Sequence, residues 1–166
     1  RGLKDRNQTL WSSMVMAGDR HRVCFSGDTG LTTEYEAIRD RLGPFDLVML
    51  EVGAFHPSWG DIPLGPANAL AAHRLLGGGV LMPVHWGTFA LATHAWDEPG
   101  EERLKRVVPR FGGLFLPRLG QPAEPAEHRE VESWWRHSEP VGQRPAAEAE
   151  PEPALAERVR GQLPWP

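Results

Sequence analysis

Residues 23–30 read VCFSGDTG, and this stretch predicts a buried strand that delivers one carboxylate into a turn. Small and apolar residues lead into a Ser-Gly turn, and Asp28 is followed directly by Thr-Gly. Glycines permit backbone conformations and close approaches that other residues resist. Because ligand residues often lie on loops held by a rigid scaffold, we interpret Asp28 as a candidate site residue.

A second stretch, VLMPVHWGTF at residues 80–89, repeats this design with a histidine. A predicted buried strand ends at His85, and Gly87 places a glycine turn directly after it. Taken alone, an Asp in a turn is usually structural, and a histidine at a strand end is more often hydrogen-bonded than functional. Carboxylate oxygen and imidazole nitrogen are both good zinc ligands, however. The shared design therefore predicts that Asp28 and His85 converge on one metal site.

Residues 33–42 have the pattern of a short helix between these two stretches. Thr33 and Glu36 fit a capping box, and Gly43-Pro44 is a typical helix end. The apolar positions of this helix recur with helical spacing and predict one buried face. They are Tyr35, Ile38 and Leu42.

The remaining chain predicts an α/β layer in which helices pack on a sheet. Residues 45–52 are mostly apolar, as in strands that are covered on both faces. The other expected elements are a half-exposed strand at 9–17 in a hairpin with the strand before Asp28, helices at 66–76 and 99–108, an irregular connection at 90–98, and a short strand at 113–117.

The loop at 53–65 is long and rich in glycine, proline and aromatic residues, and such loops are often functional. It holds His56 and Trp59, which we interpret as candidate substrate contacts. For His56, a place at the rim of the site and an ordinary loop position are equally good interpretations. Glu51, near the end of the preceding strand, either supports the metal ligands or is simply solvated.

Other aromatic and histidine side chains are weaker candidates. We expect Trp86 and Phe89 to pack rather than to contact substrate, and His73 to lie at a helix surface or boundary. The remaining histidines fall in polar or loop segments. They are His21, His94, His128 and His137.

The composition limits the classes of function. The 166 residues suffice for the core of one domain, and the net charge of −4 lies in residues 121–166, which hold nine Glu and five Arg. No basic patch for nucleic acid is evident, and no apolar run approaches the ~20 residues of a membrane span. The single Cys24 is in an apolar run and favours a reducing compartment. We therefore expect a cytoplasmic protein, and association with a membrane surface stays open.

The sequence predicts two regions, a folded body at 1–120 and a low-complexity tail at 121–166. Eight of the sixteen prolines lie in this tail, among alanine and glutamate. Such a composition buries too little apolar surface to offset the entropy of ordering, so we expect an irregular tail. The Trp134-Trp135 pair is the exception, and it is expected to dock on the body.

Several motifs, in order and at matching spacing, resemble the C-terminal half of metallo-β-lactamase-fold hydrolases. They are DRNQTLWSS, FSGDTG, GPFDLVMLEVGAF, LGPANAL and VHWGTFAL. The branch with N-acyl-phosphatidylethanolamine phospholipase D and the ascorbate-6-phosphate-lactonase-like proteins is the most similar. The resemblance implies half of an αββα sandwich and a dinuclear, usually zinc, centre. Asp28 matches the bridging, catalytic aspartate, and His85 matches the final metal histidine.

The resemblance also implies parts that this sequence lacks. The family's His-x-His-x-Asp-His motif and a further histidine ligand would precede Arg1, so we expect a fragment whose partner is the missing N-terminal half of the same domain. Pro63 stands where the family usually has a histidine that could touch the substrate.

The function implied for the intact parent is hydrolysis of a phosphodiester, or of a related ester or lactone, in a small-molecule or lipid-like substrate. The 166 residues alone are expected to be inactive. The alternative is a truncated, non-catalytic relative that serves as a binding or interaction module. The coding DNA upstream of Arg1 would discriminate between the two.

Overall fold

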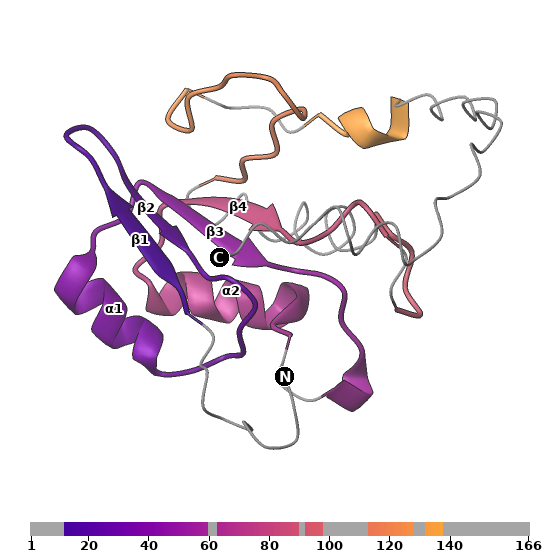
Figure 1. The fold of residues 1–166 in the computed structure, drawn as a ribbon, viewed down its shortest axis with the longest axis horizontal. Coiled ribbons are helices and arrows are strands. Elements are labelled where there is room, and N and C mark those ends of the chain that lie inside the picture. The colour runs from indigo at the N-terminus through magenta and orange to yellow at the C-terminus, as the bar shows by residue number, and fades with distance from the viewer. Residues whose placement is uncertain (1–11, 60–62, 90–91, 98–112, 128–131, 138–166) are drawn as a thin grey trace, which may run out of the picture. The chain divides into compact units, whose positions relative to one another are not determined.

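The computed structural model describes residues 12–59, 63–89, 92–97, 113–127 and 132–137, and its centre is a four-stranded sheet (Figure 1). The strands follow the order β1-β2-β3-β4 across the sheet. β1 pairs antiparallel with β2, whereas β2, β3 and β4 run parallel. The strands are β1 (Met14–Ala17), β2 (Arg22–Phe25), β3 (Leu47–Glu51) and β4 (Val80–Val84).

Two helices, α1 (Glu34–Leu42) and α2 (Gly65–Leu75), connect the parallel strands and lie on the same side of the sheet (Figure 1). The row of side chains Cys24, Val48 and Leu81 crosses the three parallel strands in register. All three are fully buried in the core. The predicted α/β layer is confirmed, and its parallel strands place their carboxyl ends at one edge.

The opposite face of the sheet carries a row of larger apolar side chains that stay partly exposed. Phe25, Met49 and Met82 form this row across β2, β3 and β4. On β1, Met14 is 55% exposed and Met16 is 53% exposed. Both α-helices that the structure describes lie on the other side, so this apolar face has neither of them as a cover (Figure 1).

Two predictions about α1 are wrong. Thr33 has helical backbone angles itself and makes no capping hydrogen bond with its side chain, so the capping box does not form. Leu42 is 43% exposed, because it is the last residue of α1 and lies beyond the buried face. Tyr35, at 1% exposure, is the residue that anchors the helix in the core.

The predicted strand at 113–117 is reduced to a single bridge between Leu114 and Leu81. The amide of Leu81 donates to the carbonyl of Gly113 (3.0 Å), and that of Phe115 donates to the carbonyl of Leu81 (2.8 Å). The strand expected at 9–17 begins at Met14, and its first residues lie outside the described part of the chain. The helix expected at 99–108 also lies outside it.

The tryptophan pair docks on the body, as predicted. It begins a short 3-10 helix, η4 (Trp134–His137). Trp135 is 3% exposed and meets Trp86 edge-on with 5.0 Å between ring centroids. The indole N–H of Trp134 donates to the carbonyl of Leu116 (3.3 Å). The described residues up to Arg136 belong to one compact unit. The irregular character predicted for 121–166 stays a prediction, because residues 128–131 and 138–166 lie outside the described part of the chain.

Candidate metal centre

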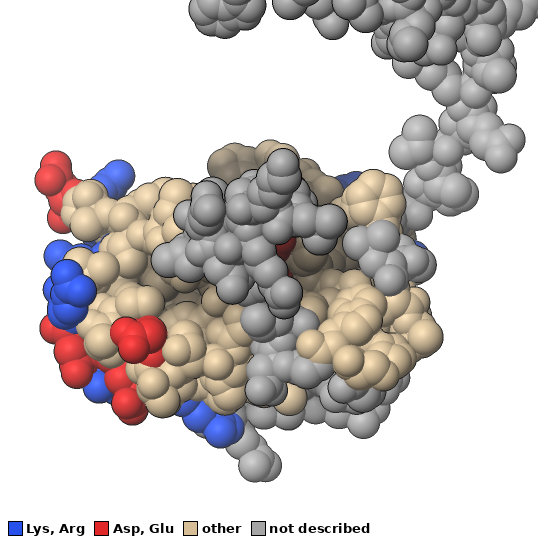
Figure 2. Space-filling model, turned by 60° about the horizontal axis from the view of Figure 1, so that its bottom comes forward, with Lys and Arg blue, Asp and Glu red and all other residues tan. Residues whose placement is uncertain are grey.

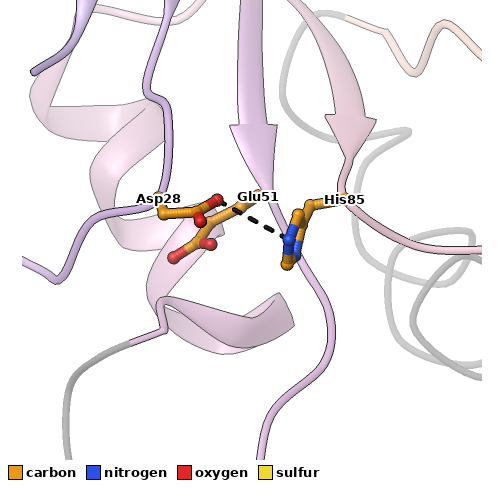
Figure 3. A group of neighbouring side chains, drawn as sticks. All are labelled: Asp28, Glu51 and His85. Atoms are coloured by element: carbon orange, nitrogen blue, oxygen red, sulfur yellow. Dashed lines mark ion pairs between the residues drawn. The ribbon is translucent and has the colours of Figure 1, made fainter. Parts of the chain in front are cut away.

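Asp28, Glu51 and His85 come together at the carboxyl edge of the three parallel strands (Figure 3). Asp28 follows β2, Glu51 is the last residue of β3, and His85 directly follows β4. One possible ligand atom from each side chain lies within 4.8 Å of the other two. The predicted convergence of Asp28 and His85 is therefore present, and a third side chain joins them.

The ring of His85 is oriented by its own backbone and by a neighbouring carbonyl. His85 has a φ of 62°, the left-handed region, which costs a non-glycine residue roughly 1–2 kcal/mol. Its Nδ1 donates a hydrogen bond to the carbonyl oxygen of Gly53. A carbonyl only accepts, so Nδ1 carries the proton and Nε2 of the neutral ring offers its lone pair. That Nε2 lies 3.6 Å from Oδ1 of Asp28.

The loop that carries Asp28 is fixed by the residues just before it. Ser26 is 1% exposed, and its hydroxyl donates to the carbonyl of Gly27 (2.8 Å) while it accepts from the amide of Glu51 (3.3 Å). Gly27 has a φ of 62°, and a Cβ there would lie 2.7 Å from the carbonyl oxygen of Ser12. Only glycine fits this position without a shift of the backbone, so Ser26-Gly27 sets the direction of Asp28.

Glu51 is buried, at 1% exposure, so the solvated interpretation is wrong. Its Oε1 accepts from the amides of Leu64 (2.8 Å) and Thr29 (3.2 Å). Its Oε2 is buried and has no hydrogen-bond partner within the described residues. Burial raises the pKa of the Glu51 carboxyl, against the lowering effect of the two backbone amides. Glu51 thereby joins the Asp28 loop to the start of α2.

These donors fit a metal cation. Two carboxylates and an imidazole are ligands that zinc accepts, and a buried carboxylate oxygen without a partner is costly unless a cation or donor meets it. The Asp28 side chain is 68% exposed and that of His85 is 48% exposed, so the group opens to solvent on one side.

A pocket of about 310 Å³ adjoins His85. One wall holds His94, whose ring stacks on Phe55 with 4.5 Å between centroids and accepts from the Phe55 amide (3.2 Å) through Nε2. Phe89 is 70% exposed at this pocket, so its expected packing role is wrong, whereas Trp86 does pack on Trp135. The lining residues are Gly53, Ala54, His85, Trp86, Thr88, Phe89, His94 and Trp96. No sequence pattern singled out His94 or Trp96.

His56 and Trp59 lie near each other, with 5.9 Å between ring centroids. His56 Nδ1 accepts from the nearby amide of Ser58 (3.1 Å), and neither residue lines the pocket beside His85. Their substrate contact stays a prediction. His73 is 1% exposed rather than at a surface, and burial lowers the pKa of its imidazole.

The beta-lactamase superfamily domain matches residues 1–86 of this chain, which include Asp28 and Glu51. The chain belongs to the metallo-β-lactamase superfamily. Its mixed sheet with helices agrees with this membership. No helix within the described ranges is long and apolar enough to cross a bilayer.

Two relatives illustrate the range of the family. An uncharacterized protein of Mycobacterium tuberculosis is 42% identical over 134 residues, covering 79% of this chain and 36% of its own length. The N-acyl-phosphatidylethanolamine-hydrolyzing phospholipase D 1 of Caenorhabditis elegans is 34% identical over 65% of this chain and 31% of its own. The chain thus spans about a third of the length of these relatives.

A solved structure supports the fold. Igni18, described as a novel metallo hydrolase from the archaeon Ignicoccus hospitalis, superposes with a TM-score of 0.51. The match covers 70% of this chain and 46% of Igni18 at 20% identity. At this identity the likeness concerns the arrangement of strands and helices alone.

Proposed function

We propose that this chain contributes half of the active site of a metal-dependent hydrolase. The observation that carries the proposal is the convergence of Asp28 and His85 at the edge of the sheet, with Nε2 and Oδ1 3.6 Å apart. Zinc is the expected metal because the donors are carboxylate and imidazole. Two ions are proposed because the resemblance to metallo-β-lactamase-fold hydrolases implies a dinuclear centre, and a carboxylate such as Asp28 is able to bridge metals ~3.5–4 Å apart.

The chain's own residues would have distinct roles in such a centre. Asp28, held by the Ser26-Gly27 turn, would offer its carboxylate as a metal ligand, and the family resemblance implies the bridging position for it. His85 offers Nε2 to one of them, and the carbonyl of Gly53 holds the ring in the required tautomer. When bound, the ions polarise the attacked group and activate water at neutral pH.

The proposed substrate is a phosphodiester, or a related ester or lactone, with an organic group that is small or lipid-like. The nematode relative, named for hydrolysis of a phospholipid, supports this class. The pocket beside His85 supports it as well, because Trp86, Phe89 and Trp96 offer apolar surface next to the proposed metals. His56 and Trp59 are proposed as additional contacts from the preceding loop.

The remaining ligands are proposed to come from residues that precede this chain in the full-length protein. A hydrolytic zinc site needs at least three protein ligands, and a dinuclear site needs more. The chain covers only 36% of its mycobacterial relative. The partly exposed face with Met14 and Met16 would then pack against the second sheet of the sandwich.

The experiment compares the 166-residue chain with the full-length protein. Metal content is measured by elemental analysis, and hydrolysis is measured with bis-nitrophenyl phosphate and with a phospholipid. We expect the full-length protein to hold two ions and to hydrolyse an ester, and the 166 residues to bind metal weakly without turnover. A full-length protein that neither binds metal nor hydrolyses either substrate would favour the binding-module alternative.

A further inference from the structure

We propose that Glu51 is a third metal ligand from this chain, and that it binds through Oε2 the ion held by Asp28 and His85. This inference rests on the proposed metal function and adds a residue to it. Neither the sequence pattern nor the resemblance assigned a ligand role to this position.

The first support is the placement of the carboxylate. Glu51 ends the central strand of the parallel three, so Asp28 and His85 flank it from β2 and β4 (Figure 3). A carboxylate oxygen of Glu51 lies within 4.8 Å of ligand atoms of both neighbours. A cation between the three side chains would need only small side-chain adjustments to contact all of them.

The second support is that the two carboxylate oxygens of Glu51 have different surroundings. Oε1 takes two hydrogen bonds, from the amides of Leu64 and Thr29, and these fix the carboxylate in place. Oε2 is buried and meets no donor within the part of the chain that the structure describes. Carboxylates that bind metals are commonly held by hydrogen bonds in this way. A carboxylate that is anchored through one oxygen, while its other oxygen meets no donor, is therefore preorganised for a cation.

The competing role for Glu51 is purely structural. In that role it joins the Asp28 loop to α2 through Oε1, and Oε2 has no function. The two roles differ in their response to Glu51→Gln. The Gln carbonyl oxygen can still accept from Leu64 and Thr29, but the amide cannot supply an anionic ligand.

The exposure of Asp28 and His85 also favours access of a cation to this group. In Figure 2, most of the visible Lys and Arg side chains gather at one end of this face, with Asp and Glu side chains among them. The exposed side of the metal group, at Asp28 and His85, provides an entry path for an ion.

The test measures Co²⁺ and Zn²⁺ affinity in the full-length protein and its variants, together with the visible spectrum of bound Co²⁺. Glu51→Gln is compared with Glu36→Gln, which changes an exposed carboxylate on α1. We expect Glu51→Gln to weaken binding at least about tenfold and to alter the Co²⁺ spectrum. Glu36→Gln should match the wild type. Circular dichroism and the melting temperature without metal verify that each variant folds.

Glu51→Asp gives a second, independent variant. It keeps the charge but withdraws the carboxylate by one methylene, so we expect weaker metal binding there too. Unchanged Co²⁺ affinity and spectrum in either folded variant would overturn the ligand role of Glu51. If Asp28→Ala and His85→Ala also leave metal binding unchanged, the proposed metal function itself fails. If only those two variants lose metal, the function stands and Glu51 is structural.

Discussion

The carbonyl oxygen of Gly53 accepts a hydrogen bond from Nδ1 of His85, so the loop after β3 orients a ring that follows β4. This bond links two neighbouring strand ends and leaves Nε2 facing Asp28. The same ring is carried by a backbone in the left-handed region, at a φ of 62°. The local cost of that conformation is tolerable only if surrounding contacts offset it, and such strain often gathers at functional sites.

The strain at His85 can be measured by comparing His85→Gly with His85→Ala. Both variants lose the imidazole and its bond to Gly53, but only glycine adopts a positive φ without cost. We expect His85→Gly to unfold with a free energy about 1 kcal/mol larger than His85→Ala in chemical denaturation without metal. Both should lose occupancy of one metal. Equal unfolding free energies of the two variants would show that the fold does not impose a positive φ at residue 85.

The Ser26-Gly27 turn predicts a sharp difference between two glycine substitutions. Gly27 and Gly78 have φ values of 62° and 89°, but only at Gly27 would a Cβ clash, 2.7 Å from the carbonyl oxygen of Ser12. Gly27→Ala should therefore destabilise the chain by at least ~1 kcal/mol more than Gly78→Ala, which carries the conformational cost alone. Gly27→Ala should also lower metal affinity, because Asp28 is displaced. Similar unfolding free energies and metal affinities would contradict this account of the turn.

The buried imidazole of His73 predicts a loss of stability in mild acid. Burial lowers its pKa from the ordinary 6.5, and its Nε2 bonds to the carbonyl of Gly79 (3.0 Å). Below pH ~6.5 the imidazole of residue 73 binds a proton in the unfolded chain but stays neutral in the folded chain. The free energy of unfolding therefore falls as the pH drops from ~6.5 toward the lowered pKa of the folded state.

His73→Gln removes this titration and serves as the comparison. The slope of unfolding free energy against pH should be smaller in the variant by up to ~1.4 kcal/mol per pH unit between pH 6.5 and 5. Above pH 7.5 the slopes should coincide, because the imidazole is then neutral in both states. Other groups, including Glu51, contribute equally to both proteins and cancel. Parallel slopes down to pH 5 would mean that His73 is protonated equally in both states.

Much of the fold follows from local sequence. The apolar runs before Asp28, at 45–52 and before His85 predict buried strands, and these runs became β2, β3 and β4. The convergence of Asp28 and His85 could be predicted because parallel strands align their carboxyl ends. The capping box at Thr33 failed because the amide of Glu36, which the box needs, already donates to the backbone carbonyl of Thr33 (3.0 Å).

The role of Glu51 could not be read from the sequence. A carboxylate at the end of an apolar strand is equally compatible with solvent and with a buried site. The free-energy cost of burying this carboxylate is offset by hydrogen bonds from the amides of Leu64 and Thr29, which lie 13 and 22 residues away along the chain. The pocket residues His94 and Trp96 were also missed. They follow no periodic pattern in the sequence, and only the tertiary fold brings them to the site.

The most direct test of the metal centre is the metal content of full-length Asp28→Ala, measured by elemental analysis beside the rate of phosphodiester hydrolysis. Glu36→Gln serves as the control for loss of a carboxylate on the surface. Without the carboxylate that we propose as the bridge, we expect the variant to lose at least one ion and its turnover, while circular dichroism remains that of the wild type. A folded Asp28→Ala protein that keeps both ions and near-normal turnover would make Asp28 a turn residue and contradict the account.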